Sequence, residues 1–243
     1  MSMKKKVEKF EFVIIEIVNG YFVADQKLAL LLPLLEDKEL FGVWDGTAGV
    51  SGVEALRLTL YMAILSDMRA LLFDNDKRAA SLEQVVEALK NEHFVKVIRK
   101  RFCKPSGVKV LGHDDDEEMR QFVEEQVQDQ QIKNAEETFD RLLPQTIQLF
   151  EKLKASKLAG RVDNARSKMI SHKEIRTVDG QRALYNPTDF GLKWGDASDV
   201  VLQTRDIIFN CNLLINNSSY DLNSFLGGHK KAASSFWGVA KNA

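Results

Sequence analysis

The chain has 243 residues, of which 44% are hydrophobic and 28% charged, and its formal net charge is −1. These values are ordinary for a globular protein that buries its own core, and the near-neutral charge means that any nucleic-acid-binding surface must be local. Four prolines and 14 glycines are few for this length, which disfavours an all-β architecture rich in turns.

The cysteines and the N-terminal sequence both indicate the compartment. Cys103 and Cys211 are the only cysteines, and their isolation excludes a disulfide framework and suits a reducing cytosol. The chain starts with a lysine run followed by apolar residues, but charged residues interrupt the apolar part and no cleavage site follows. No segment reaches the roughly 18 uninterrupted apolar residues of a membrane span. We therefore expect a cytoplasmic protein.

The first half of the chain reads as helices. Residues 10–18, FEFVIIEIV, fit a strand or a helix by pattern, and we interpret them as a helix because no partner strands are evident. Residues 52–73 repeat apolar side chains at helical spacing over a broad face, which predicts a helix central to the core. Residues 81–90 open with Ser81 and Gln84 at capping-box spacing, which predicts the start of an amphipathic helix.

Helices also dominate the second half. Residues 104–113 contain proline and glycine and predict a loop. A helical pattern then runs over 114–153, and Pro144 should kink it or mark a new start. A helix is expected at about 157–172, followed by a loop, and residues 196–221 predict a last amphipathic helix.

These elements predict an all-α fold, a bundle of long helices joined by short loops in one domain over residues 1–216. Residues 217–243 are rich in serine, glycine and lysine, so we expect a peripheral, loose C-terminal tail there. No period of 20–50 residues repeats, which argues against a solenoid.

Charge is segregated along the chain. Residues 90–109 hold seven bases and one acid, residues 114–140 hold eleven acids and two bases, and residues 151–176 hold eight bases and three acids. A solvated helix face explains each run. For residues 98–110, in which Phe102 stands among five bases, an RNA-contacting strip is an equal alternative.

A metal site is not expected. His113 precedes five consecutive acids, but acids at the start of a helix are explained by the favourable helix dipole. No other spacing of histidines and carboxylates completes a coordination sphere. The sequence therefore predicts neither a metal nor a cofactor.

Residues 164–176, NARSKMISHKEIR, place Arg166 six positions before His172. Such a pair suits metal-independent RNA cleavage, in which a 2′-hydroxyl attacks the adjacent phosphorus. Histidine, with an ordinary pKa of about 6.5, takes the proton, and the arginine fork holds the phosphoryl oxygens. The leaving 5′-oxygen also needs a proton donor, and a symmetric dimer would supply it with a second copy of the motif.

Spacing alone supports this pair weakly, because arginine and histidine fall at such distances by chance. On a helix the two residues flank an apolar stripe on opposite sides. The stripe consists of Leu158, Val162, Ala165 and Met169. The pair would meet at one phosphate only if the helix ended between them or a second copy packed across the stripe. In the structural alternative the stripe faces the chain's own core and Arg166 pairs with Asp163.

Several blocks in order carry a resemblance. They are Leu60–Tyr61 with Ile64–Leu65, the connector DNDKRAASL from Asp74 to Leu82, and the motif from Arg166 to His172. Together they resemble the HEPN superfamily, in particular its abortive-infection Abi-U type, over roughly residues 50–215. The order of several blocks is more specific than any one motif.

The resemblance implies a helical, usually dimeric protein that acts as a ribonuclease in phage defence, or as a toxin with an antitoxin partner. It assigns Arg166 and His172 as the catalytic pair. We expect Lys168, Lys173 and Arg176 to attract the RNA backbone. Two alternatives remain, which are a non-catalytic HEPN-like module that binds RNA or a protein, and a helical scaffold in which Arg166 supports packing.

Overall fold

The protein is seen in a computed structural model that describes residues 2–74, 76, 78–105, 117–165, 167, 175–178, 181–184 and 187–241. The helices are α1 (Met3–Glu36), α2 (Lys38–Gly42), α3 (Val50–Phe73), α4 (Leu82–Leu89), α5 (Glu92–Phe102), α6 (Glu117–Lys154), α7 (Lys157–Ala165), α8 (Gly195–Asn216) and α9 (Leu222–Lys241). The other elements are an antiparallel pair, β1 (Ile175–Val178) and β2 (Gln181–Leu184), and the 3-10 helix η2 (Pro187–Phe190). The predicted all-α fold class is confirmed.

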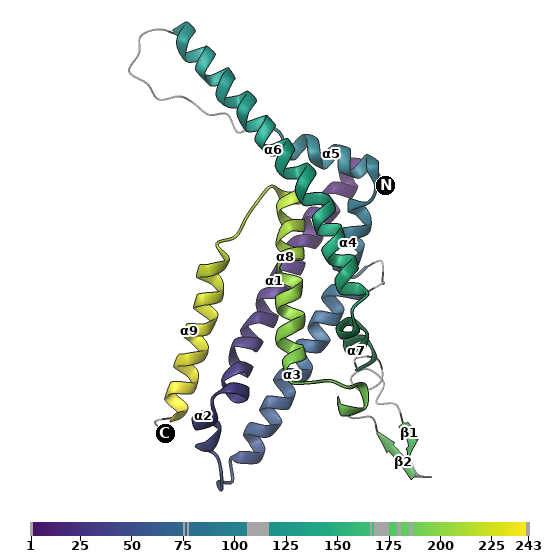
Figure 1. Ribbon diagram of the computed structural model, residues 1–243, viewed down its shortest axis with the longest axis vertical. Helices are drawn as coiled ribbons and strands as arrows, with labels where there is room; N and C mark the ends of the chain where they lie inside the picture. The colour runs from purple at the N-terminus through teal and green to yellow at the C-terminus, as the bar shows by residue number, and fades with distance from the viewer. Residues whose placement is uncertain are drawn as a thin grey trace.

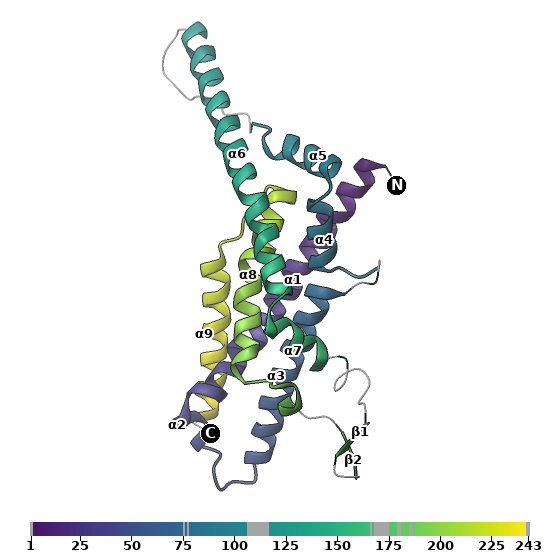
Figure 2. The same ribbon diagram turned by 45° about the vertical axis from the view of Figure 1, so that its right-hand side comes forward.

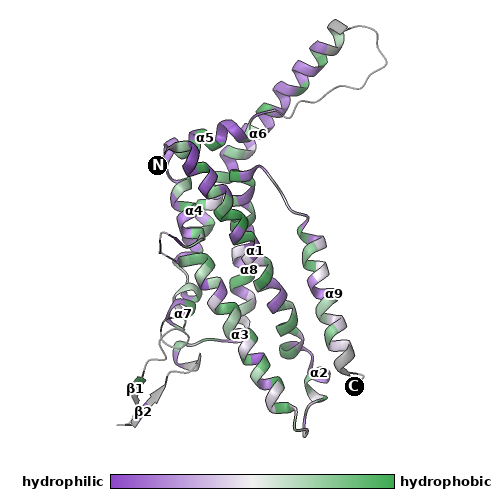
Figure 3. Ribbon diagram, turned by 180° about the vertical axis from the view of Figure 1, so that it is seen from behind, coloured by the Kyte–Doolittle hydropathy of each residue, from purple (hydrophilic) through white to green (hydrophobic). Residues whose placement is uncertain are grey.

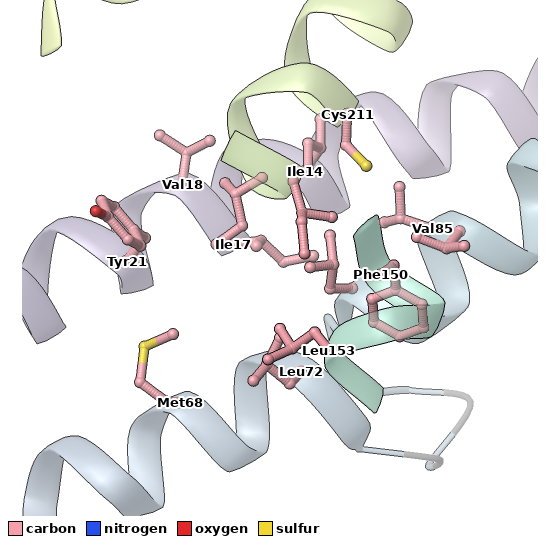
Figure 4. Close-up of a cluster of buried hydrophobic side chains, with 14 of the residues drawn as sticks. Ile14, Ile17, Val18, Tyr21, Met68, Leu72, Val85, Phe150, Leu153 and Cys211 are labelled. Atoms are coloured by element: carbon pink, nitrogen blue, oxygen red, sulfur yellow. The ribbon is translucent and has the colours of Figure 1, made fainter. Parts of the chain in front are cut away.

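Helix α1 runs through the middle of the bundle (Figures 1 and 2). It packs against α3, α8 and α9, while α6 packs along α8. One apolar core joins these helices, as Figure 4 shows for its upper part, where Ile14 and Ile17 of α1 meet Leu72 of α3, Phe150 of α6 and Cys211 of α8. All five side chains are fully buried. The core therefore fixes four helices against one another.

The stretch FEFVIIEIV lies within α1, so the interpretation as a helix is confirmed. Phe10 and Ile14 are buried, whereas Phe12 between them is 64% exposed. In a strand these three side chains would share one face, because successive residues alternate. The burial of Ile17, four residues after Val13, follows the helical period instead.

The connector from α3 to α4 departs from the predicted capping box. Ser81 is the N-cap of α4, but its hydroxyl makes no cap bond to the helix. Its Oγ instead donates to the Asp74 carbonyl at 2.7 Å, and Gln84 Nε2 donates to the carbonyls of Asp76 and Ala79. Both side chains thus stabilise the incoming connector, because they donate to carbonyls that lie outside the helices.

Helix α6 continues through Pro144 without a new start. Phe139 and Phe150, on either side of the proline, are both fully buried, and α6 packs along α8. This packing holds the course of the helix although the proline removes one backbone hydrogen bond. The predicted loop at 104–113 and His113 lie largely or wholly outside the described residues.

Where the sequence predicts a loose tail, the structure has helix α9 alongside α1 (Figure 1). Asn217, with φ of 49°, ends α8 in the left-handed conformation, so the helix expected to reach residue 221 stops at Asn216. Phe225 of α9 stacks on Phe22 of α1 with ring centroids 4.8 Å apart, and His229 Nδ1 lies 2.7 Å from Asp25 Oδ2. The predicted domain boundary at 216 falls between α8 and α9.

Trp237 tests whether α9 contributes to the stability of the bundle. It is 5% exposed, and its Nε1 donates to the Leu30 carbonyl of α1 at 3.0 Å. We expect Trp237→Ala to lower the free energy of unfolding by about 3 kcal/mol, as measured by urea denaturation. Phe236→Ala is the matched control, because Phe236 is the adjacent residue and is 57% exposed. Equal effects of the two substitutions would show that α9 is not docked.

Candidate active site

The site predicted from the sequence begins at the end of α7. Ser156 caps this helix, since its Oγ accepts a hydrogen bond from the Ala159 N–H at 3.1 Å. Leu158, Val162 and Ala165 form a buried stripe, so the predicted apolar face of this helix is confirmed for these three residues. The helix packs against α3, α6, α8 and η2, so it is held in the bundle up to its last residue.

An ion pair fixes the outer side of α7 to α3. Arg69 Nε donates to Asp163 Oδ1 at 2.8 Å, and the Arg69 side chain is 17% exposed. Asp163 therefore already has an arginine partner from another helix. This contact weakens the structural alternative in which Asp163 serves Arg166.

A second ion pair joins α7 to the start of α8. Arg161 Nε and Nη2 donate to the two carboxylate oxygens of Asp196 at 3.1 and 2.6 Å, and the Asp196 carboxylate is buried. Asp196 also accepts the Lys193 N–H, while the Lys193 carbonyl accepts the Tyr61 hydroxyl of α3 at 2.8 Å. Hydrogen bonding to Asp196 raises the pKa of Arg161. These bonds tie three helices together around α7.

Gly191 lies near this ion pair, in the turn from η2 into α8. Its φ of +65° lies in the left-handed region, which glycine adopts without strain. A Cβ at this position would meet the Cδ of Arg161 at 3.7 Å. The turn from η2 into α8 therefore depends on this glycine for its backbone conformation and not for space.

Within residues 164–176 the structure describes only Asn164, Ala165, Ser167, Ile175 and Arg176. Arg166, Lys168, His172 and Lys173 lie outside the described residues, so their assignment stays a prediction. Arg176 lies in β1, where its backbone pairs with Ala183 of β2. Figures 1 and 2 show this β-hairpin beside the end of α7. It replaces the loop that the sequence predicts after residue 172.

The structure also shows a cation, Arg57, that lies over two aromatic rings and that the sequence did not single out. The Arg57 guanidinium of α3 lies 4.8 Å from the Phe41 ring centroid and 4.9 Å from that of Trp194. Its Nε is buried with no hydrogen-bond partner in the described structure, and Trp194 is 41% exposed. An exposed indole beside an arginine resembles the surfaces on which single-stranded bases stack. The sequence signal that was available is the position of Arg57 among apolar residues in LRLTL, residues 56–60.

The described parts of the chain offer little support for metal or thiol chemistry. They hold no group of three or more histidine, cysteine or acidic side chains placed to bind a metal ion. Burial raises the pKa of the thiols of Cys103 and Cys211, which disfavours the reactive thiolate. None of the described helices has the length and apolar character needed to cross a bilayer.

The described residues form a helical bundle, and in the sequence the short helix α7 is followed by Arg166 and His172. A family model described as AbiU2, of the HEPN group, matches residues 47–236. Because this match covers more than half of the 243 residues, the chain belongs to the AbiU2 family of HEPN proteins. No curated protein and no solved structure matches the chain.

Loss of Arg161 tests how firmly α7 is held. We expect Arg161→Met to lower the free energy of unfolding by about 2 kcal/mol, because the buried Asp196 carboxylate would lose its charge partner. The control is Arg205→Met, since Arg205 contacts Asp206 at 3.4 Å in an exposed pair and should cost less than about 0.5 kcal/mol. Denaturant titration measures both, and similar values for the two variants would contradict the anchoring role.

Proposed function

We propose that this protein is a metal-independent endoribonuclease in which Arg166 and His172 from two copies form a composite site. The family match carries the proposal, because it spans both residues. His172 takes the proton of the 2′-hydroxyl, and the second copy's imidazole gives a proton to the leaving 5′-oxygen. Arg166 holds the negative phosphoryl oxygens with its planar fork.

The surroundings of α7 support this role for Arg166. Arg69 and Arg161 each have a carboxylate partner in the bundle, so they are structural cations. Arg166 follows directly on Ala165, which is fully buried at the end of α7. A catalytic cation that starts from a rigid helix loses little further freedom when it binds phosphate.

The proposed substrate is RNA, and the proposed setting is the cytoplasm of a bacterium. Lys168, Lys173 and Arg176 add positive charge around the pair and attract the RNA backbone. The abortive-infection family supports a role in phage defence or in a toxin–antitoxin system, with an antitoxin protein as a further partner. No cofactor takes part in the proposed reaction.

RNA cleavage in the presence of a chelator tests the proposal. We expect wild-type protein to cut RNA, and His172→Ala and Arg166→Ala each to lower the rate by about 100-fold or more. The matched controls are His93→Ala and Arg78→Ala, because both side chains are exposed on other elements. Both controls should cleave as the wild type does.

The outcomes separate the alternatives. Equal cleavage by wild type and both motif variants would point to a contaminating nuclease and reject the assignment. No cleavage by the wild type, together with RNA binding that depends on Lys168 and Lys173, would favour a non-catalytic RNA-binding module. If the wild type neither cleaves nor binds RNA, the alternative that remains is a helical scaffold.

A further inference from the structure

The N-terminal part of α6 extends beyond the rest of the bundle. The helix has 38 residues, which corresponds to about 57 Å at 1.5 Å per residue. Gln131 and Asn134 line a pocket with Phe102 of α5 and Leu213 of α8, so the packed part of α6 starts near residue 131. Residues 117–130, here called the α6 arm, project past the other labelled elements (Figures 1, 2 and 3).

The α6 arm exposes apolar side chains on a mostly polar helix. Phe122 is 58% and Val123 37% exposed, and Figure 3 shows such hydrophobic positions among hydrophilic ones at this end. A lone helix of this length is only marginally stable in water. A projecting helix with exposed aromatic and branched side chains is therefore suited to packing against another surface.

The charge of the α6 arm restricts the kind of surface. Residues 117–130 contain five acids and one base. Such a helix is repelled by nucleic acid and by anionic lipid surfaces. Two arms packed on each other would also repel, because like charges would face each other. The fitting surface is an apolar groove with basic edges.

The chain has such a groove at the same end of the molecule. A groove of about 440 Å³ between α1 and α5, here called the α1/α5 groove, is lined by Met3, Val7 and Val97 with Lys4, Arg101 and two glutamates. One of these, Glu11, is paired with Arg101. Lys96 and Lys100 are exposed on α5, and within the described structure neither they nor Lys4 makes an ion pair. The surroundings of the groove are therefore basic.

The arm of a molecule does not face its own groove. The packed half of α6 is fixed along α8, and the helix continues in one direction through the arm. Figures 1 and 2 show the arm pointing away from α5 and the start of α1. The occupant of the groove must therefore come from another molecule.

We propose that the α6 arm of one copy docks in the α1/α5 groove of a second copy, with Phe122 and Val123 on the apolar floor. The acidic residues of the arm then face the lysines at the edge of the groove. If both arms exchange, the contact is a twofold dimer. The arm, α5 and the start of α1 lie toward the opposite end of the long axis from the β-hairpin (Figure 1), so this contact is separate from the composite ribonuclease site and does not depend on it.

Sedimentation over a series of protein concentrations tests the contact. We expect Phe122→Glu to reduce self-association by at least tenfold in the dissociation constant, because it puts a charge on the apolar floor. The control is Leu202→Glu, since Leu202 is 52% exposed on α8 and lies outside the arm and the groove. Because the composite site would by itself join two copies, the readout is the difference between the two proteins. The proposal is overturned if Phe122→Glu and the wild type reach the same assembly at every concentration.

A groove variant and a mixing experiment make the test specific. Val97→Glu should weaken association as Phe122→Glu does, with circular dichroism confirming that α5 remains folded. A mixture of the two variants contains one intact arm and one intact groove, so it should associate more strongly than either variant alone. Failure of the mixture to associate would contradict the pairing of arm with groove.

Cross-linking identifies the partner directly, and it does not rely on a substitution that weakens association. In a Cys103→Ser background, Val123→Cys combined with Val97→Cys should form a covalent dimer on oxidation. A disulfide within one chain, or none, would overturn the proposal. Because none of these measurements uses RNA, failure of the ribonuclease proposal leaves the result unaffected.

Discussion

The burial of α1 is the constraint on which the rest of the structure depends. Its apolar residues point in more than one direction, because α3, α8 and α9 all pack on it. Ile14 and Ile17 are fully buried, and each contributes about 1.5–3 kcal/mol by leaving water. The family match begins at residue 47, yet the matched helices pack around this earlier helix. The matched region and α1 thus share one hydrophobic core.

Helix α7 shows a different balance of forces. With nine residues it is too short to be stable by itself, and its buried stripe contains small side chains such as Ala159 and Ala165. Ion pairs add fixed contacts from α7 to α3 and α8. Such directional contacts fix the rotation of a helix more closely than apolar contacts do. The orientation of α7 in the bundle is therefore fixed up to Ala165.

The long helix α3 could be predicted from the sequence because its burial pattern repeats many times, whereas for α1 the pattern of residues 10–18 fitted a strand as well as a helix. The local contacts of individual side chains could not be predicted in this way. Ser81 and Gln84 have capping-box spacing, but the path of the preceding connector brings its carbonyls to them instead. Pro144 does not divide α6, because buried phenylalanines on both sides hold the helix. Helix α9 was missed since glycine and serine obscure the few positions, such as Trp237, that dock it.

The candidate site was predictable only in part for a related reason. The residue types of the motif indicate a reaction, and the family supports it, but neither gives the rotation of α7 or the partners of its charges. Arg69 and Arg161 were as plausible as Arg166 by type, and only the structure shows that carboxylates occupy them. An arginine that already binds a carboxylate offers a phosphate fewer free N–H donors and less net charge.

The basic and acidic runs of the sequence also pair with each other in the folded protein. Arg99 of the basic run binds Asp140 with two hydrogen bonds of 2.8 Å and Glu136 with one of 3.0 Å, and it lowers the pKa of Asp140. The basic and acidic runs therefore neutralise each other where α5 and α6 are adjacent. Beyond that point α6 leaves the bundle, so its acids separate from the lysines of α5. The separation leaves acidic residues on the projecting part of α6 and lysines on α5, and this charge complementarity is what the proposed contact between two copies rests on.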